Sequence, residues 1–304
     1  MSGWFSNLAL KIARVADFVG SIGRQNYTVA ERLSVVRARR THGLDARLLN
    51  FQVSFLAEGA YQLLLREIFF KGEYFFKANT DSPTIFDCGA NIGLATLYFK
   101  HIYPNARISS FEADPTTAQV LKKNVDRNHL QNVSVHNLML SNAEGDHPFY
   151  TAAGEAGVLS MSANPERTSN CREIIVKAGK LSAYIDGPVD LVKLDVEGAE
   201  WDVMTDLKNS GKLSLIRRLI IEYHHKIGSQ ASCLGRFLSL LEEEGFEYQI
   251  AAAGCDPIAR QGVCQDILIG AYRSLPNEGL AAPPVSVPDG NRTFPDSPSH
   301  LSES

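Results

Sequence analysis

The chain contains a glycine turn of the kind that binds nucleotide-like cofactors. The turn, Asp87-Cys-Gly-Ala-Asn-Ile-Gly93, follows the apolar residues 84–86 and leads into the helical pattern of residues 94–99. This order predicts a buried strand, a tight turn and a helix N-terminus, which together present free backbone N–H groups to a ligand. Gly89 and Gly93 let the backbone approach that ligand closely, because neither carries a Cβ.

The spacing of these glycines indicates which cofactor is bound. A dinucleotide-binding turn has the pattern G-x-G-x-x-G, whereas Gly89 and Gly93 are spaced as G-x-x-x-G with no third glycine in register. The difference disfavours a pyrophosphate, and with it a nicotinamide-dependent dehydrogenase. It favours a cofactor without a pyrophosphate, for which S-adenosylmethionine is the candidate.

Other residues are expected around the same cofactor. Glu112 ends the second predicted strand, where a carboxylate can accept hydrogen bonds from two ribose hydroxyls; a carboxylate in a surface turn is the alternative. Asp87 is expected to order the glycine turn or to meet the cofactor amino group through water. The segment from Asn137 to Leu140 ends the third strand, and its residues either frame a purine ring or belong to the core.

A second group of polar residues follows the fourth predicted strand. The segment Lys193-Leu-Asp-Val-Glu-Gly-Ala-Glu200 holds three carboxylates, and ligands of open α/β sheets bind at this edge of the sheet. Carboxylates that merely favour a helix N-terminus are the alternative.

The next strand along the chain ends near the same place and adds His224. We expect Asp195, Glu197, Glu222 and His224 to converge and to hold and deprotonate a hydroxyl group, with a carboxylate or the imidazole as the base. A divalent cation bound by the same oxygen atoms is a further alternative, so the sequence leaves a metal site undecided.

The elements that position these residues alternate along the chain. This alternation predicts an α/β fold with a mostly parallel, doubly wound sheet. Residues 148–187 are less regular and are expected to shape the pocket for the acceptor molecule. Strands are expected at 48–56, 84–87, 107–111, 133–138, 189–194, 216–223, 246–251 and 265–272, and helices at 4–22, 29–40, 60–70, 94–102, 116–128, 199–210 and 231–244.

The composition restricts the class of protein. The net charge of −4 argues against nucleic acid as a partner, and the 44% apolar content is ordinary for a globular chain. The five cysteines include no CxxC pair, so neither a disulfide framework nor a zinc site is indicated. With no signal peptide and no apolar run that could span a bilayer, a cytoplasmic protein is expected.

Both ends of the chain differ from its centre. Residues 1–47 hold eight basic and three acidic residues, and helix 4–22 is expected to pack on the domain or a second subunit, with an interfacial membrane helix as the alternative. Residues 274–304 hold six of the 13 prolines and are predicted to be a disordered tail. The predicted organisation is a helical extension over 1–59, a catalytic domain over 60–273 and this tail.

Four motifs together resemble the FkbM family of S-adenosylmethionine-dependent methyltransferases over about residues 60–250. They are 87–93, 111–115 (Phe-Glu-Ala-Asp-Pro), 140–145 (Leu-Ser-Asn-Ala-Glu-Gly) and 193–200. The resemblance implies a Rossmann-like class I methyltransferase domain whose seven-stranded sheet has an antiparallel last strand. It also implies O-methylation of a hydroxyl on a sugar, a glycan or glycolipid, or a natural product.

The resemblance also assigns residues to the site. Asp87, Gly89, Asn91 and Gly93 would line the cofactor and Glu112 would hold its ribose, while Asp195 and Glu197 would face the site of methyl transfer. A non-catalytic, cofactor-binding scaffold that docks a partner or an anionic surface through the basic N-terminus remains the alternative function.

Overall fold

The computed structural model describes only part of the chain, and these described residues form one compact unit ending at Arg273. The predicted helix 4–22 and the predicted tail 274–304 lie outside them. The described ranges are 27–152, 161–167, 171–229, 231, 233–252 and 265–273.

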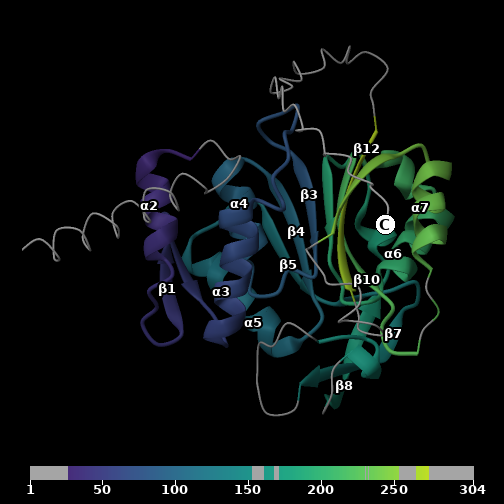
Figure 1. Ribbon diagram of the computed structural model, residues 1–304, viewed down its shortest axis with the longest axis horizontal. Helices are drawn as coiled ribbons and strands as arrows, with labels where there is room; N and C mark the ends of the chain where they lie inside the picture. The colour runs from purple at the N-terminus through teal and green to yellow at the C-terminus, as the bar shows by residue number, and fades with distance from the viewer. Residues whose placement is uncertain are drawn as a thin grey trace, which may run out of the picture. The chain divides into compact units, whose positions relative to one another are not determined.

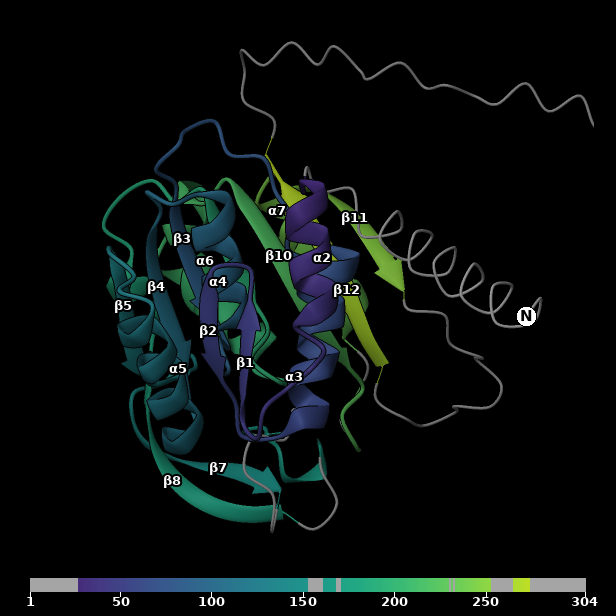
Figure 2. The same cartoon turned by 90° about the vertical axis from the view of Figure 1, so that its left-hand side faces the viewer.

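A seven-stranded sheet forms the centre of this unit, in the order β11-β12-β10-β9-β3-β4-β5 (Figures 1 and 2). Five neighbouring strands, β10, β9, β3, β4 and β5, are parallel to one another. Strand β12 runs antiparallel to its neighbours β10 and β11. The predicted Rossmann-like sheet with an antiparallel last strand is therefore confirmed. The bounds are β3 (Thr84–Cys88), β4 (Arg107–Glu112), β5 (Val133–Asn137), β9 (Leu191–Leu194), β10 (Arg218–His225), β11 (Glu247–Ala252) and β12 (Gln265–Tyr272).

Helices cover both faces of this sheet, as doubly wound connections require. In both views α3 and α4 lie on one side of it and α6 and α7 on the other. Local signals set the helix starts: Asp114 caps α5 by accepting a hydrogen bond from the N–H of Thr117, and Pro115 occupies the first turn. The helices are α2 (Val29–Arg37), α3 (Glu58–Leu64), α4 (Leu94–Ile102), α5 (Pro115–Arg127), α6 (Glu200–Asn209) and α7 (Leu234–Glu243).

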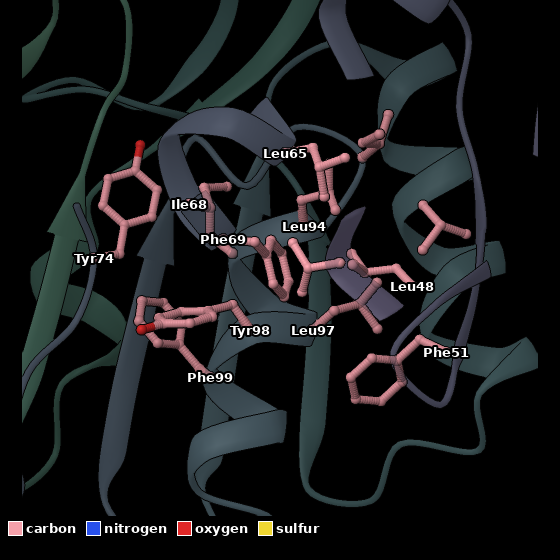
Figure 3. Packing of buried hydrophobic residues seen from close by; sticks show 14 of the residues in the cluster. Leu48, Phe51, Leu65, Ile68, Phe69, Tyr74, Leu94, Leu97, Tyr98 and Phe99 are labelled. Atoms are coloured by element: carbon pink, nitrogen blue, oxygen red, sulfur yellow. The ribbon is translucent and has the colours of Figure 1, made fainter. Parts of the chain in front are cut away.

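Alternate residues of the central strands supply two separate hydrophobic cores. Ile85 and Leu191 join the cluster under α3 and α4, whereas Phe86 and Val192 join the cluster under α6 and α7. This is the period-two alternation of a strand that is buried on both faces. Figure 3 shows the first cluster, in which Phe69 and Tyr98 pack edge to face with ring centroids 5.3 Å apart.

The region around residues 45–56 differs from the prediction of a single strand. It forms a hairpin of β1 (Asp45–Leu48) and β2 (Phe51–Ser54), because the chain reverses at Leu49, whose φ is 55°. The buried side chains of Leu48 and Phe51 join the core under α3 and α4. The domain boundary near residue 59 stays a prediction, and the hairpin shares its core with the sheet.

The segment 148–187, expected to be irregular, contributes β8 and most of β7 to a second small sheet. Its strands are β6 (Met139–Leu140), β7 (Gly145–Ala152) and β8 (Cys171–Gly179), with β7 antiparallel and β6 parallel to β8. Short 3₁₀ helices η2 (Pro165–Arg167), η3 (Leu181–Tyr184) and η4 (Lys212–Leu215) link the elements, and helix α3 continues as a π-helix, η1 (Leu65–Lys71), where one helix was expected. None of the described helices is both long and apolar enough to cross a membrane.

Candidate active site

The glycine turn brings the end of β3 into direct contact with the end of β9. Gly89 has a φ of +80°, and a Cβ at this position would lie 1.6 Å from the carbonyl oxygen of Asp195. Gly93, with a φ of +90°, precedes α4, and a Cβ there would lie 2.6 Å from Leu121. The two glycines are therefore required by backbone conformation and by close packing of neighbouring elements.

Below the turn, a buried lysine joins two of the predicted site residues. The Nζ of Lys193 lies 3.6 Å from Asp87 Oδ1 and 3.2 Å from Asp195 Oδ2, and it donates a 2.7 Å hydrogen bond to the carbonyl of Gly89. Thr96 donates to the other oxygen of Asp87 at 2.6 Å. Asp87 therefore contacts α4 through Thr96 and is linked to the glycine turn through Lys193, and its role toward a cofactor stays a prediction.

Glu112 is buried at the end of β4 and lines a pocket beside the turn. Its two carboxylate oxygens accept hydrogen bonds of 2.9 Å from the N–H groups of Asn91 and Asp114. Burial raises the pKa of Glu112 to about 7, although these two hydrogen bonds oppose the shift. Asn137 donates hydrogen bonds from Nδ2 to the carbonyls of Glu112 and Ala113, so it holds the backbone at the end of β4 in place.

Six of the ten predicted site residues line the pocket, and the other four do not. It has about 760 Å³ of atom-free space, part of it open to solvent, and its walls come from the glycine turn, the strand ends and η1. Asp87, Gly93, Asn137 and His224 are not on its walls. The predicted residues that line it are Gly89, Asn91, Glu112, Leu140, Asp195 and Glu197.

His224 lies next to this pocket with a side chain that is only 1% exposed. Its Nδ1 is 2.9 Å from Glu200 Oε1, and its Nε2 is 3.2 Å from Glu197 Oε2 and 4.0 Å from Asp195 Oδ1. Burial lowers the pKa of His224, but Glu200 and Glu197 outweigh it and raise the pKa well above its usual value. The structure thus brings the three predicted catalytic side chains together.

Glu222, two residues before His224 on β10, completes the predicted group. The nearby carboxylate of Asp195 and burial raise its pKa well above the usual value for a glutamate, and the positive charges of His224 and Lys193 oppose this shift only in part. The raised pKa of Glu222 reflects the negative charge that the neighbouring carboxylates concentrate at this end of the sheet.

Glu200 and Arg167 belong to this cluster, although neither was predicted to have a role of its own. Glu200 Oε1 accepts hydrogen bonds from the N–H groups of Val196 and Gly198 as well as contacting His224, so it fixes the turn after β9. Arg167, from η2, pairs with Glu197 at 2.9 Å and with Asp266 at 3.4 Å. Glu200 was visible as the last carboxylate of its motif, whereas no sequence signal identified Arg167.

The strand order, the glycine turn and the acidic motif define a Rossmann-like methyltransferase. A model of the methyltransferase FkbM domain matches residues 87–248, more than half of the chain. The chain therefore belongs to the FkbM methyltransferase family, as its motifs predicted.

Two methyltransferases and one solved structure are similar to this chain. Methyltransferase sdnD of Sordaria araneosa is 30% identical over 217 residues, which cover 61% of this chain and 82% of that protein. Methyltransferase 1 of Beauveria bassiana is 28% identical over an alignment of 205 residues, and the match covers 61% of this chain and 80% of that protein. A crystal structure of Methyltransferase FkbM from Methylobacillus flagellatus is similar with a TM-score of 0.44 and 15% identity; the match covers 88% of this chain and 60% of that one.

Proposed function

We propose that this methyltransferase uses S-adenosylmethionine to methylate a hydroxyl group of a sugar, a glycan or glycolipid, or a natural product. The observation that carries the proposal is the contact of its two motifs: the backbone of Gly89 lies against the carbonyl of Asp195. A ligand on the glycine turn therefore has the carboxylates of Asp195 and Glu197 at one end, because both line the same pocket as Glu112.

The residues of the pocket fit this cofactor. The buried carboxylate of Glu112 is available to ribose hydroxyls, and the backbone at Gly89 and Asn91 borders the same space. Residues 138–140 supply apolar surface for a purine ring. Bound S-adenosylmethionine supplies a methyl group made electrophilic by its sulfonium centre.

Oxygen is the proposed methyl acceptor because the transfer end of the pocket offers bases for a hydroxyl proton. Asp195 and Glu197 line the pocket directly, whereas His224 lies next to it and contacts Glu200 and Glu197. We assign removal of the proton to Asp195 and positioning of the two carboxylates to His224. A positioned base contributes about 10²–10⁴-fold to such a reaction, and holding the hydroxyl at the reacting centre contributes further.

Calorimetry with the full chain tests the cofactor. S-adenosylmethionine and S-adenosylhomocysteine should bind, and Glu112→Ala should weaken both. Asp126→Ala is the matched control, because this carboxylate is exposed on α5 and pairs only with Lys122 among the described residues. Absence of binding to folded wild-type protein would remove the cofactor proposal.

Methyl transfer is then measured with labelled cofactor against a panel of sugars, glycolipids and hydroxylated natural products. Methyl label on a hydroxyl oxygen supports the proposal, and label on nitrogen or carbon contradicts the O-methyl assignment. Cofactor binding without transfer to any compound would favour the scaffold alternative.

A further inference from the structure

The two nitrogen atoms of His224 have different surroundings. Nδ1 lies 2.9 Å from Glu200 Oε1, and both side chains are almost completely buried, with exposures of 1% and 2%. A carboxylate on one imidazole nitrogen fixes a proton there and leaves the lone pair of the other nitrogen available to a metal ion. Nε2 faces the carboxylates of Glu197 and Asp195, so a metal ion that replaces the proton on Nε2 meets three electron-pair donors.

Nε2 has no hydrogen-bond partner of acceptable geometry among the described residues, although it is fully buried. Glu197 Oε2 is 3.2 Å away and Asp195 Oδ1 is 4.0 Å away, and the three ligand atoms lie within 4.8 Å of one another. Two ligands about 2.1 Å from one ion are about 3.0 Å apart in cis and about 4.2 Å apart in trans. The spacing of the three atoms therefore suits a single small cation between them.

The backbone at Glu197 independently marks this turn as specialised. Its φ is 53°, a left-handed conformation that costs energy for a residue with a Cβ. Glu200 holds this conformation by accepting hydrogen bonds from the N–H groups on both sides of Glu197. The same carboxylate thus fixes the positions of two of the three ligand side chains, Glu197 and His224.

The charge around the site favours a cation. Lys193 and Arg167 carry permanent positive charges there, and each forms ion pairs with two carboxylates. The four carboxylates beside the imidazole, those of Asp195, Glu197, Glu200 and Asp266, outnumber these two cations once a bound metal ion has replaced the proton on Nε2 of His224. The carboxylates on this side of the sheet are those of Asp195, Glu197, Glu200, Glu222 and Asp266.

We propose that Asp195, Glu197 and His224 bind a divalent cation of the oxygen-preferring type, such as Mn²⁺ or Mg²⁺. Two carboxylates and one imidazole match such an ion, and three protein ligands leave positions open for an acceptor hydroxyl and water. The cation occupies the place between Nε2 and the two carboxylates and makes a bound hydroxyl more acidic. This role in the reaction rests on the proposed function, whereas the binding of the ion does not.

Binding of Mn²⁺ to the metal-free full chain, followed by electron paramagnetic resonance and calorimetry, tests the site. One Mn²⁺ per chain is expected, and Glu197→Gln and His224→Gln should each weaken it by on the order of tenfold or more. Asp126→Asn is the control for adventitious binding to exposed carboxylates and should have no effect. His224→Gln should also abolish the hyperfine coupling of Mn²⁺ to an imidazole nitrogen.

Two outcomes would overturn the site: no saturable Mn²⁺ binding by the wild type, or equal affinity in folded Glu197→Gln and wild-type protein. Glu197 is 22% exposed, so its variant keeps the inference testable if His224→Gln does not fold. Calorimetry of S-adenosylmethionine in the presence of EDTA separates the two proposals. Methyl transfer that EDTA leaves unchanged would remove the role of the cation in the reaction and retain the proposed function. Absence of S-adenosylmethionine binding both with and without EDTA would remove the proposed function and leave the Mn²⁺ result to decide the metal site.

Discussion

Lys193 links the two motifs of the site by charge. Its ammonium group is buried between Asp87 and Asp195, and those carboxylates raise its pKa although burial alone would lower it. It also donates a hydrogen bond to the carbonyl of Gly89. The lysine therefore holds the glycine turn and the end of β9 in one arrangement.

Replacing Lys193 with Met should destabilise the protein by about 3–5 kcal/mol, because removal of one partner leaves uncompensated buried charge. Denaturation by urea measures the loss. The double variant Asp87→Asn, Lys193→Met should recover part of it, since one of the stranded carboxylates is then neutral. A single variant as stable as wild type would show that the ion pairs contribute nothing net.

Glu112 gives cofactor binding a predicted pH dependence. The raised pKa of about 7 means that the carboxyl group is protonated below neutral pH, where it accepts fewer hydrogen bonds from ribose hydroxyls. Cofactor affinity should therefore fall as pH falls, by about tenfold between pH 8 and pH 6. Calorimetry across this range measures the effect. In Glu112→Gln the affinity should be lower and independent of pH, and an unchanged slope would assign the titration to another group.

Asp195 should matter for the reaction more than for the cofactor. Asp195→Asn keeps the shape of the side chain but removes the proposed base, so turnover should fall by about 10²–10⁴-fold. The cofactor dissociation constant, measured by calorimetry on the same preparation, should change far less. Normal turnover in this variant would make the proposed role wrong.

At the scale of elements, α5 fastens the β1–β2 hairpin to the glycine turn through Asn124. Its side chain exchanges two hydrogen bonds, of 2.7 and 2.9 Å, with the backbone of Ser54, and it donates a third, of 2.8 Å, to the carbonyl of Ile92. All of these groups are buried around one side chain that has no solvent exposure. An element near the N-terminus thereby supports the cofactor turn.

Asn124→Ala should leave those backbone groups without partners, at a cost of about 1–3 kcal/mol for each group that water cannot reach. Asn128→Ala is a matched control from the same helix end, because Asn128 makes the same pair of bonds to Gln52 at a half-buried position. The control should lose much less stability in urea denaturation. If both variants lost the same free energy of unfolding, burial of the hydrogen-bonded groups would not determine the loss.

The elements differ in how far the sequence predicts them. The strand–helix units were predictable, because their strands are apolar runs and their turns carry signals such as Asp114-Pro115. The pairing of β7 with β8 was not, since residues 153–170 separate the two strands and Ile175, within the apolar run 174–176, is 61% exposed. Likewise, the contact of Arg167 with Glu197 joins residues 30 positions apart and has no local signature.

Across the described molecule, one sheet separates two cores, and the N-terminal hairpin belongs to one of them. The side chains of Leu48, Phe51 and Val53 are buried beside α3, α4 and the central strands. Burial of each such side chain contributes about 1.5–3 kcal/mol, against a total stability of about 5–15 kcal/mol for a typical domain. Cutting the chain at the predicted boundary, residue 59, should therefore remove a large part of the free energy of unfolding.

Deleting residues 1–59 should prevent residues 60–273 from folding cooperatively, because the core under α3 and α4 loses one wall and Asn124 loses its partners on Ser54. Circular dichroism and urea denaturation of the fragment measure this. Deleting residues 274–304, which lie outside the described residues, is the control and should leave the transition unchanged. If the fragment 60–273 instead unfolds at the same urea concentration as the full chain, the hairpin is dispensable and residue 59 marks an independent domain.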